Sequence, residues 1–235
     1  MKRLHCTLSS PAENLALDEQ LLQDVNRGEY SDGILRLWES TCHFIVLGLS
    51  KKVSEDVAVD ACRADDIPIF RRCSGGGTVL QGPGCFNYAF ILPIHSDEAL
   101  LNLQKTTAHV LSKVQATLRA LIPNSEQRGI SDLAIDGIKF SGNAQRRLKH
   151  AILFHGTILY QFDLDLVSRY LKEPLVQPDY RNQRSHQQFI SNLPISQKDL
   201  MSAFEQAYPT PLALTPVISP DVMAKYLDNT WHFKR

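Results

Sequence analysis

Apolar residues recur at three- and four-residue steps in two long stretches of the chain, which is the spacing of one helix face. The first stretch follows Ser10-Pro11-Ala12-Glu13, a capping box with proline at the first helical position. We therefore expect a helix from Pro11 to Asn26. The second stretch predicts a helix over residues 97–121, which Pro123 ends. We expect shorter helices over residues 54–64, capped by Ser54, over residues 163–171, and after the capping residues Ser196 and Ser219.

Runs rich in β-branched and aromatic residues lie between these helices and predict strands. They cover residues 33–39, 43–49, 67–71, 78–80, 85–94, 133–135, 138–140 and 151–159. The pair Asp136-Gly137 between two of these runs is a strong hairpin signal. Residues 172–188 are polar and rich in proline and glutamine, so we expect a surface loop there. Strands dominate the middle of the chain and helices flank them. This order predicts one α+β domain over residues 1–235, with a central mixed or antiparallel sheet.

Charge and composition narrow the class of protein. Lys+Arg and Asp+Glu number 25 each and no basic arm is present, so a nucleic-acid partner is disfavoured. The N-terminus lacks the apolar segment of a signal peptide, and the most apolar run, 86–94, is too short to cross a bilayer. We expect a soluble, cytoplasmic protein without a membrane partner. The five cysteines are an odd number and lack C-x-x-C spacing, which argues against a disulfide framework and a zinc site.

The segment Arg71-Arg72-Cys73-Ser74-Gly75-Gly76-Gly77-Thr78 joins two of the expected strands. Glycines let the main chain take positive φ and let a ligand approach it closely. Three adjacent backbone N–H groups can then surround one anionic group. A plain hairpin turn is the alternative. The two arginines favour an anion site, because guanidinium groups form charge-assisted bonds to carboxylate or phosphate and a structural turn does not need them.

Lys139 lies just after the expected hairpin turn, between Ile138 and Phe140. If these two neighbours face the core, alternation along the strand turns Lys139 toward solvent. The alternative is that Lys139 lies in a cleft. There its ammonium would neutralise an anion held by the segment 71–78, which we call the glycine loop. Small residues at 75–77 and at Ser141-Gly142 suit opposite walls of a narrow slot. The residue types alone leave both interpretations open.

Three further residues are candidates for chemistry. Asp132 is a carboxylate on a loop before the hairpin; most such residues cap turns, but Mg²⁺ bound to phosphates needs only one or two carboxylates. His155 fits a hydrogen-bonded structural histidine better than a base. Cys85 follows a flexible Gly-Pro-Gly turn, but no histidine or helix N-terminus is expected beside it to lower the pKa of its thiol. We therefore interpret Cys85 as a buried structural thiol.

Several motifs together resemble the lipoate–protein ligase A family, within the wider group of biotin and lipoate protein ligases. The matching segments keep the family's order from about residue 10 to 195. They are Asn14-Leu15-Ala16-Leu17-Asp18-Glu19, Arg71-Arg72-Cys73-Ser74-Gly75-Gly76-Gly77-Thr78-Val79, Cys85-Phe86-Asn87-Tyr88, Ser131-Asp132-Leu133 with Asp136-Gly137-Ile138-Lys139-Phe140-Ser141-Gly142, and His155-Gly156-Thr157-Ile158-Leu159. The resemblance implies a biotin/lipoate ligase-like fold and two half-reactions at one site. ATP and Mg²⁺ first convert lipoate, or octanoate, into an acyl-adenylate. A carrier lysine then takes the acyl group and AMP leaves.

The same resemblance implies roles for individual residues. Lys139 would be catalytic and would contact both the lipoyl carbonyl and the phosphate. The ATP and adenylate side would be held by Arg72, Gly77, Thr78, Val79, Leu80, Lys139 and Asp132, with Asp132 near Mg²⁺. Lipoate would be bound by Ser74, Gly75, Gly76, Lys139, Ser141, Gly142 and His155. Burying its four chain methylenes contributes about 3 kcal/mol, so we expect an apolar slot, lined by the strands that contain Phe86 and Phe154.

Two departures from the family keep other activities open. Many bacterial members have a further C-terminal domain, and we expect none here, so a separate accessory subunit could assist. Transferase relatives form a thioester on a cysteine near the Asp-Gly-x-Lys segment, whereas no cysteine follows Cys85 in this sequence. This favours the ligase over the alternatives, an ATP-independent lipoyl or octanoyl transferase and a non-catalytic lipoyl-binding subunit; a biotin ligase fits less well. The implied partner is a lipoyl carrier domain of a 2-oxoacid dehydrogenase or a glycine-cleavage H-type protein.

Overall fold

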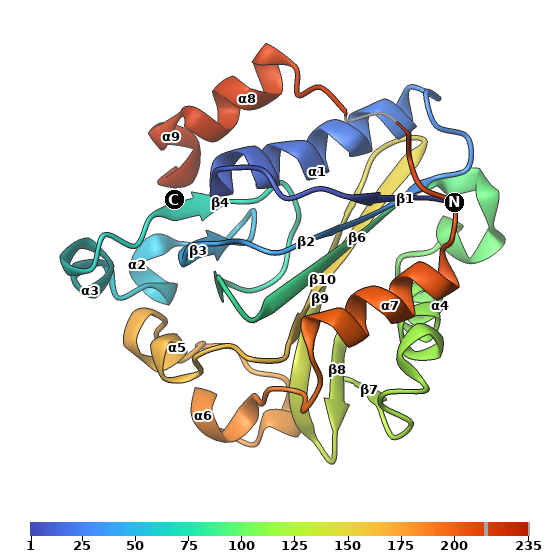
Figure 1. Ribbon diagram of the computed structural model, residues 1–235. Helices are drawn as coiled ribbons and strands as arrows, with labels where there is room; N and C mark the ends of the chain where they lie inside the picture. Colours follow the sequence, from blue (N-terminus) through green and yellow to red (C-terminus); the bar gives the residue numbers. More distant parts are fainter. Residues whose placement is uncertain (214–215, 235) are drawn as a thin grey trace.

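The strands form two sheets in the computed structural model, which describes residues 1–213 and 216–234 (Figure 1). The larger sheet has seven strands, in the spatial order β1 (Lys2–His5), β2 (Ile34–Trp38), β6 (Cys85–Pro93), β10 (Ala151–Leu159), β9 (Ile138–Arg147), β8 (Asp132–Ile135) and β7 (Glu126–Arg128). The outermost pair, β1 and β2, is parallel, and the other neighbours are antiparallel. This mixed sheet confirms the expected α+β class.

The smaller sheet has three strands, β4 (Ile69–Arg71), β3 (Phe44–Leu47) and β5 (Val79–Gln81), with β3 in the middle. Strand β4 is parallel to β3, and β5 is antiparallel to it. The glycine loop therefore leaves the sheet on one side of β3 and returns on the other. A plain hairpin turn, in which the two flanking strands would pair with each other, is excluded.

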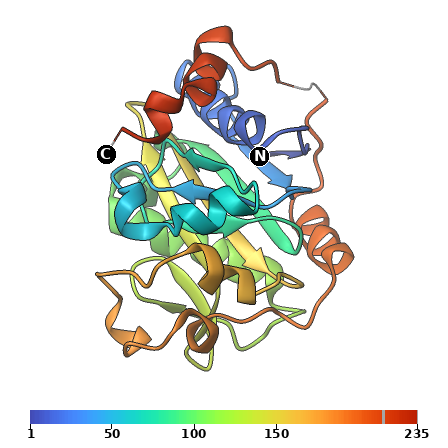
Figure 2. The same cartoon turned by 90° about the vertical axis from the view of Figure 1, so that its left-hand side faces the viewer.

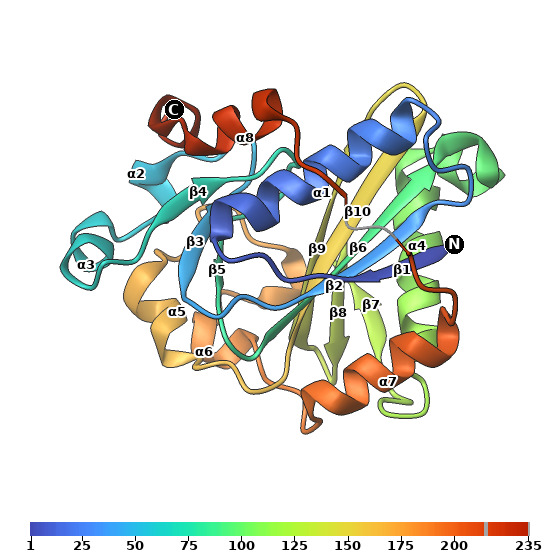
Figure 3. The same cartoon turned by 45° about the horizontal axis from the view of Figure 1, so that its top comes forward.

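Alternation along the central strands decides which helices cover each face of the larger sheet. Tyr88, Phe90 and Phe154 point to the face covered by α4 (Leu103–Leu118) and α7 (Gln197–Ala207). Ala89 and Leu153, one residue away, point to the opposite face, where α1 (Pro11–Asn26) crosses the sheet (Figure 3). The remaining α-helices are α2 (Val53–Asp56), α3 (Val59–Ala64), α5 (Asp165–Tyr170), α6 (His186–Phe189), α8 (Pro220–Leu227) and α9 (Asn229–His232).

Local signals confirm several expected elements. Ser10 and Glu13 form the reciprocal capping box of α1, and Ser196 and Ser219 cap α7 and α8. The turn between β8 and β9 has φ of 50° at Asp136 and 71° at Gly137, as a two-residue hairpin requires. The helix bounds of α1 and the strand bounds of β10 agree with those expected.

Other expected elements were wrong in extent. Residues 54–64 form two short helices, α2 and α3, and Lys52, not Ser54, is the N-cap residue of α2. The stretch 97–121 contains a 3₁₀ turn, Glu98–Leu101, before α4 begins after its cap Asn102. Strand β9 continues well past the hairpin, and β1, β7 and α9 were not anticipated. The side chains of Phe86 and Phe154 belong to the core under α4 and α7, whereas His155, the residue after Phe154 in strand β10, lies beside the glycine loop on the opposite face.

The five cysteines are free thiols, and Cys62, Cys73 and Cys85 are buried. None of the helices within residues 1–213 and 216–234 has the length and apolarity needed to cross a membrane.

Candidate active site at the glycine loop

The glycine loop has a backbone that only glycine accommodates at its centre. Gly76 has φ of +87°, and a Cβ there would lie 2.9 Å from Arg72 Nη2 and 3.3 Å from Ala144 Cβ. A side chain at this position would therefore be strained and would collide with its neighbours. Gly75 and Gly77 have open space around their Cβ positions. The loop thus rests on β9 at Ala144 and leaves room on its outer side.

Arg72 fixes the loop from inside. Its Nε donates to Ser74 Oγ at 3.0 Å, and its Nη2 donates to the carbonyl oxygens of Gly75 at 2.6 Å and Gly77 at 2.9 Å. The side chain is buried, and burial lowers the pKa of Arg72 to about 10, so it remains a cation at neutral pH. Because the two carbonyl oxygens turn toward Arg72, this side chain holds the loop in one shape, with a buried positive charge behind it.

Arg71 has a different function from the one that its sequence position suggested. It is fully buried, and its Nη1 donates to the carbonyl oxygens of Gly48 at 3.0 Å and Lys51 at 2.6 Å. Its guanidinium also donates to carbonyl oxygens of α9. The premise that a structural turn has no need of arginines was therefore wrong, since this buried side chain joins the carbonyl oxygens of two segments that are far apart in the sequence.

Ser74 and His155 connect the loop to β10. Ser74 Oγ lies 2.6 Å from His155 Nε2. Ser74 Oγ also accepts from Arg72 Nε, and which of Ser74 and His155 donates in their contact depends on the tautomer of the imidazole. Burial, together with the nearby Arg72 cation, lowers the pKa of His155 to about 3. His155 is thus a neutral, hydrogen-bonded ring at physiological pH, as the structural interpretation from sequence expected.

Lys139 forms the other side of the site with Asp132. Its Nζ lies 2.7 Å from Asp132 Oδ1, and about a quarter of its side chain, 26%, is exposed. The hydroxyl of Tyr180 donates to Asp132 Oδ2 at 2.7 Å. Phe189 lies under the ammonium, with 6.0 Å from Nζ to the ring centroid. Lys139 is therefore held over a carboxylate at the edge of the protein and does not extend into bulk water.

Strand β9 brings the lysine and the glycine loop to the same face of the sheet. A Cβ at Gly142 would lie 2.9 Å from Lys139 Nζ, and Ala144, two residues on, touches the position of Gly76. Gly142 pairs with Thr157 and Ala144 with His155, so these residues share one face. The sequence predicted a slot between glycine-rich walls, and the structure brings together Gly76, Gly142, Lys139 and His155.

The hydroxyl of Ser141 is not part of this face. Ser141 is buried on the α4 side, with its Oγ 3.3 Å from Asn143 Nδ2 and 3.5 Å from Tyr88 OH. Any role of Ser141 toward a ligand would need its backbone, because a strand turns successive side chains to opposite faces.

The residues after the glycines are fixed by their neighbours. Thr78 Oγ1 donates to Asp56 Oδ2, and Lys51 Nζ lies 3.4 Å from the same carboxylate. Val79 and Leu80 lie in β5 and pair with β3. Any contact of Val79 or Leu80 with a ligand would therefore come from a strand that is held in place by its pairing with β3.

Sequence reasoning missed Tyr180, which lies in the 3₁₀ turn Asp179–Arg181 of the loop expected between residues 172 and 188. An aromatic residue in a polar loop was the one local signal. Its contact with Asp132 spans 48 positions and follows from the fold alone.

The described residues contain no group of three or more histidine, cysteine or acidic side chains that could hold a metal ion. Within residues 1–213 and 216–234, Asp132 is the carboxylate that pairs with Lys139, and both of its oxygens have donors. This arrangement does not make a protein-only metal cage. It fits a cation that arrives with phosphate and water ligands of its own.

Comparison of this sequence with known proteins identifies a family and several relatives. The model of the lipoyl protein ligase A/B catalytic domain matches residues 10–206. A probable lipoate-protein ligase A of Mycoplasma pneumoniae is 32% identical over 161 residues, which are 68% of this chain and 46% of that protein. An octanoyltransferase LipM of an Exiguobacterium species is 30% identical over 178 residues, covering 66% of this chain and 64% of that protein. The chain spans about half the length of curated ligases that it matches.

Two solved structures share the fold. A lipoate-protein ligase A bound with ATP has a TM-score of 0.78 and 20% identity, with 99% of each chain covered. The bi-partite lipoate protein ligase of Thermoplasma acidophilum, solved with its E2 lipoyl domain, has a TM-score of 0.77 and 20% identity over 99% of this chain and 96% of that one. Because the family model matches most of the sequence, residues 10–206, the chain belongs to the lipoyl protein ligase A/B catalytic domain family.

Proposed function

We propose that this protein is an ATP-dependent lipoate–protein ligase, which activates lipoate or octanoate as the acyl-adenylate and transfers it to a lysine of a carrier domain. The observation that carries the proposal is the pair of Lys139 and Asp132, 2.7 Å apart, on the same face of β9 as the glycine loop. A partly exposed ammonium beside a fixed glycine turn can contact two anions at once. It therefore suits a reaction in which the carboxylate of lipoate approaches a phosphate of ATP.

In the first half-reaction a lipoate oxygen attacks the α-phosphorus of ATP and pyrophosphate leaves. Two anions must approach each other, so the main obstacle is charge. Lys139 would contact the incoming carboxylate and the α-phosphate together. The backbone of Gly77, Thr78, Val79 and Leu80 would hold the nucleotide, with the buried Arg72 cation behind the loop.

In the second half-reaction the amine of the carrier lysine attacks the acyl carbon, AMP leaves and the amine loses a proton. Lys139 would again stabilise charge, now on the acyl oxygen and the departing phosphate. The acyl chain would lie against Ser74, Gly75, Gly76, Gly142 and the neutral ring of His155. A neutral imidazole suits an apolar chain, because an imidazolium would have to lose its water shell there.

Mg²⁺ would accompany ATP and neutralise part of the phosphate charge when bound. Asp132 is the residue that would contact it, after exchange of the Lys139 or Tyr180 contact for the ion. The relative solved with ATP and the relative solved with an E2 lipoyl domain support a nucleotide and a carrier domain as the other components. A lipoyl domain of a 2-oxoacid dehydrogenase or a glycine-cleavage H-type protein would be the acceptor.

The second candidate is an ATP-independent octanoyl transferase, and its support is the likeness to an octanoyltransferase. Such an enzyme would need a thiolate to carry the acyl group. Burial raises the pKa of the Cys73 thiol to about 12 and that of Cys85 further still. Neither thiol is ionised at neutral pH, and the sequence has no cysteine beyond Cys85. These features favour the ligase.

The experiment that tests the proposal follows pyrophosphate release by the purified chain with ATP, Mg²⁺ and lipoate. Release that depends on lipoate, followed by acylation of a lipoyl domain, is the expected result. Acylation from an octanoyl carrier-protein thioester without ATP would establish the transferase instead. Binding of lipoate without either reaction would indicate a non-catalytic subunit, and release only after a second subunit is added would indicate a bi-partite enzyme.

A further inference from the structure

The last described segment of the chain, residues 216–234, lies outside the part that matches the family model and contacts the strand before the glycine loop. Helix α8 packs along α1, where Lys225 Nζ lies 2.7 Å from Glu19 Oε2 and the Tyr226 hydroxyl donates to the same oxygen at 2.7 Å. The chain then turns into α9, which lies beside β4 (Figure 2).

Side chains of α9 bind the free edge of β4. The backbone N–H of Arg71 donates to His232 Nδ1 at 3.0 Å, and Trp231 Nε1 donates to the carbonyl oxygen of Arg71 at 2.8 Å. An edge residue therefore has both backbone groups satisfied by two side chains, as a neighbouring strand would satisfy them. His232 can accept at Nδ1 because its Nε2 donates to the carbonyl oxygen of Tyr226 at 3.0 Å.

The Arg71 guanidinium continues the connection toward the site. It donates to the carbonyl oxygens of Trp231 at 3.1 Å and His232 at 2.9 Å on one side. On the other side it donates to those of Gly48 at 3.0 Å and Lys51 at 2.6 Å. The turn 48–51 is thus joined to α9 through one buried arginine.

This turn touches the glycine loop directly. The backbone N–H of Leu49 donates to the carbonyl oxygen of Ser74 at 2.8 Å. A Cβ at Gly48 would lie 2.1 Å from the carbonyl oxygen of Gly76, so the two main chains are in contact. The loop is therefore held from inside by Arg72 and from outside by the turn that Arg71 supports.

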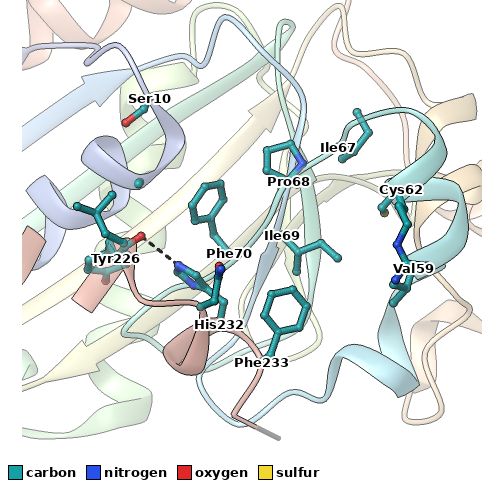
Figure 4. A pocket seen from close by; sticks show the side chains of 14 residues that line it. Ser10, Val59, Cys62, Ile67, Pro68, Ile69, Phe70, Tyr226, His232 and Phe233 are labelled. Carbon is teal, nitrogen blue, oxygen red and sulfur yellow. Dashed lines mark hydrogen bonds between the residues drawn. The ribbon is translucent and has the colours of Figure 1, made fainter. Parts of the chain in front are cut away.

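Hydrogen bonds and side-chain packing together hold α9 in place. A cavity of about 580 Å³ separates parts of α9, β4 and α3, and Ile69, Phe70 and Phe233 line it (Figure 4). The ring of His232 meets Phe70 edge-on at 5.0 Å. The bonds of Trp231 and His232 to Arg71 therefore act on a helix that borders open space on one side.

We propose that Trp231 and His232 are positioning residues for the glycine loop, which act through Arg71 and the turn 48–51. Neither residue touches a reacting group. The inference rests on the proposed function only for its effect on catalysis; its effect on the loop is independent of any reaction.

The primary test is hydrogen–deuterium exchange of a peptide covering residues 72–80. Trp231→Phe removes the indole donor and keeps the ring, and His232→Ala removes the acceptor for Arg71. We expect each to speed exchange in this peptide about tenfold, since each removes one net hydrogen bond from the support of the loop. His232→Asn retains an acceptor near the position of Nδ1 and should restore most of the protection.

Phe233→Ala is the matched control, because Phe233 lies in the same segment, is 49% exposed and lines the same cavity. It should leave loop exchange unchanged. Peptides from α4 should exchange alike in all variants. Equal acceleration across the whole chain, or an unchanged loop in both Trp231→Phe and His232→Ala, would overturn the proposal.

Kinetics give a second readout. If lipoate-dependent pyrophosphate release is observed, Trp231→Phe should lower kcat/KM about tenfold, chiefly through a raised KM for ATP, as expected for a misplaced nucleotide loop. If the wild type releases no pyrophosphate, either alone or with a second subunit, the proposed function fails and the exchange experiment still decides the positioning role. A reduced kcat/KM without any change in loop exchange would also contradict the inference.

Discussion

Two pairs of opposite charge on the larger sheet have nearly the same length and opposite surroundings. Arg36 Nη1 and Asp18 Oδ1 lie 2.6 Å apart under α1, with side-chain exposures of 0% and 5%. Lys139 Nζ and Asp132 Oδ1 lie 2.7 Å apart beside the glycine loop, with exposures of 26% and 14%. Distance alone does not distinguish a structural pair from a functional one.

The difference lies in how many hydrogen bonds each cation has already formed. Arg36 donates to Asp18, to the carbonyl oxygens of Cys6 and Asn14, and to the Asn14 amide oxygen, so each of its three nitrogens is satisfied. Burial raises the pKa of Asp18, and the Arg36 guanidinium opposes that shift. A cation with all of its donors occupied holds α1 to the sheet.

Lys139 has donors in reserve. Within the described parts of the chain its ammonium contacts the Asp132 carboxylate and the face of Phe189, although an ammonium has three protons to donate. It is also close enough to the surface to gain or lose a partner at low cost. A charge pair that is incomplete and accessible can exchange its partner for a substrate.

Among changes to these two charge pairs, we expect Arg36→Met to have the largest effect, which is on the free energy of unfolding. It leaves the Asp18 carboxylate buried without a counter-charge, so the free energy of unfolding should fall by about 3–5 kcal/mol. Urea denaturation of the purified protein measures it. A loss below about 1 kcal/mol would mean that the buried pair contributes no more than a surface pair.

Lys139→Met should have the opposite effect, with little change in stability and a large loss of activity. The free energy of unfolding should change by less than about 1 kcal/mol, because the pair is partly exposed. Lipoate-dependent pyrophosphate release should fall by about 10²–10³, the usual cost of one transition-state donor. Lys149→Met, an exposed lysine beyond β9, is the matched control and should retain wild-type activity. If Lys139→Met retains half of the activity, Lys139 is not the catalytic cation.

The smallest effect concerns the Ser74–His155 contact and has a defined pH dependence. Because burial and the Arg72 cation hold the pKa of His155 at about 3, the folded protein excludes a proton that the unfolded chain binds below about pH 6.5. This contribution to stability is present above pH 6.5 and is lost as the pH falls.

Comparison of the wild type with His155→Gln isolates this contribution of His155 to the pH dependence, since glutamine can still form a hydrogen bond with Ser74 and does not titrate. Between pH 6.5 and 5.5 the wild type should lose about 1 kcal/mol more of unfolding free energy than the variant. Parallel pH profiles for the two proteins would show that His155 is protonated in the fold.

Elements set by local chemistry could be predicted from the sequence. The capping box of Ser10 and Glu13 fixed the start of α1, and the Asp136-Gly137 turn fixed the hairpin that carries Lys139. The family motifs indicated candidate site residues, of which the structure brings Gly76, Gly142, Lys139 and His155 together. These features depend on neighbours within a few positions.

Features that depend on distant partners could not be predicted. The order β4-β3-β5 is set by pairing and not by strand propensity, so the sequence left a plain hairpin turn open as the alternative for the glycine segment. The structural role of Arg71 depends on α9, about 160 positions away, and that of Tyr180 on Asp132. Short polar strands such as β7 (Glu126–Arg128) carry no apolar alternation and form because β8 offers an edge.

The contact of Gly48 with Gly76 has a consequence for engineering. Any residue larger than glycine at position 48 would push against the carbonyl oxygen of Gly76. The turn 48–51 and the glycine loop must therefore fit each other in shape. A chimera that imports residues 71–80 from a relative with another acyl preference should fail to seat its new loop unless residues 48–51 are transplanted with it.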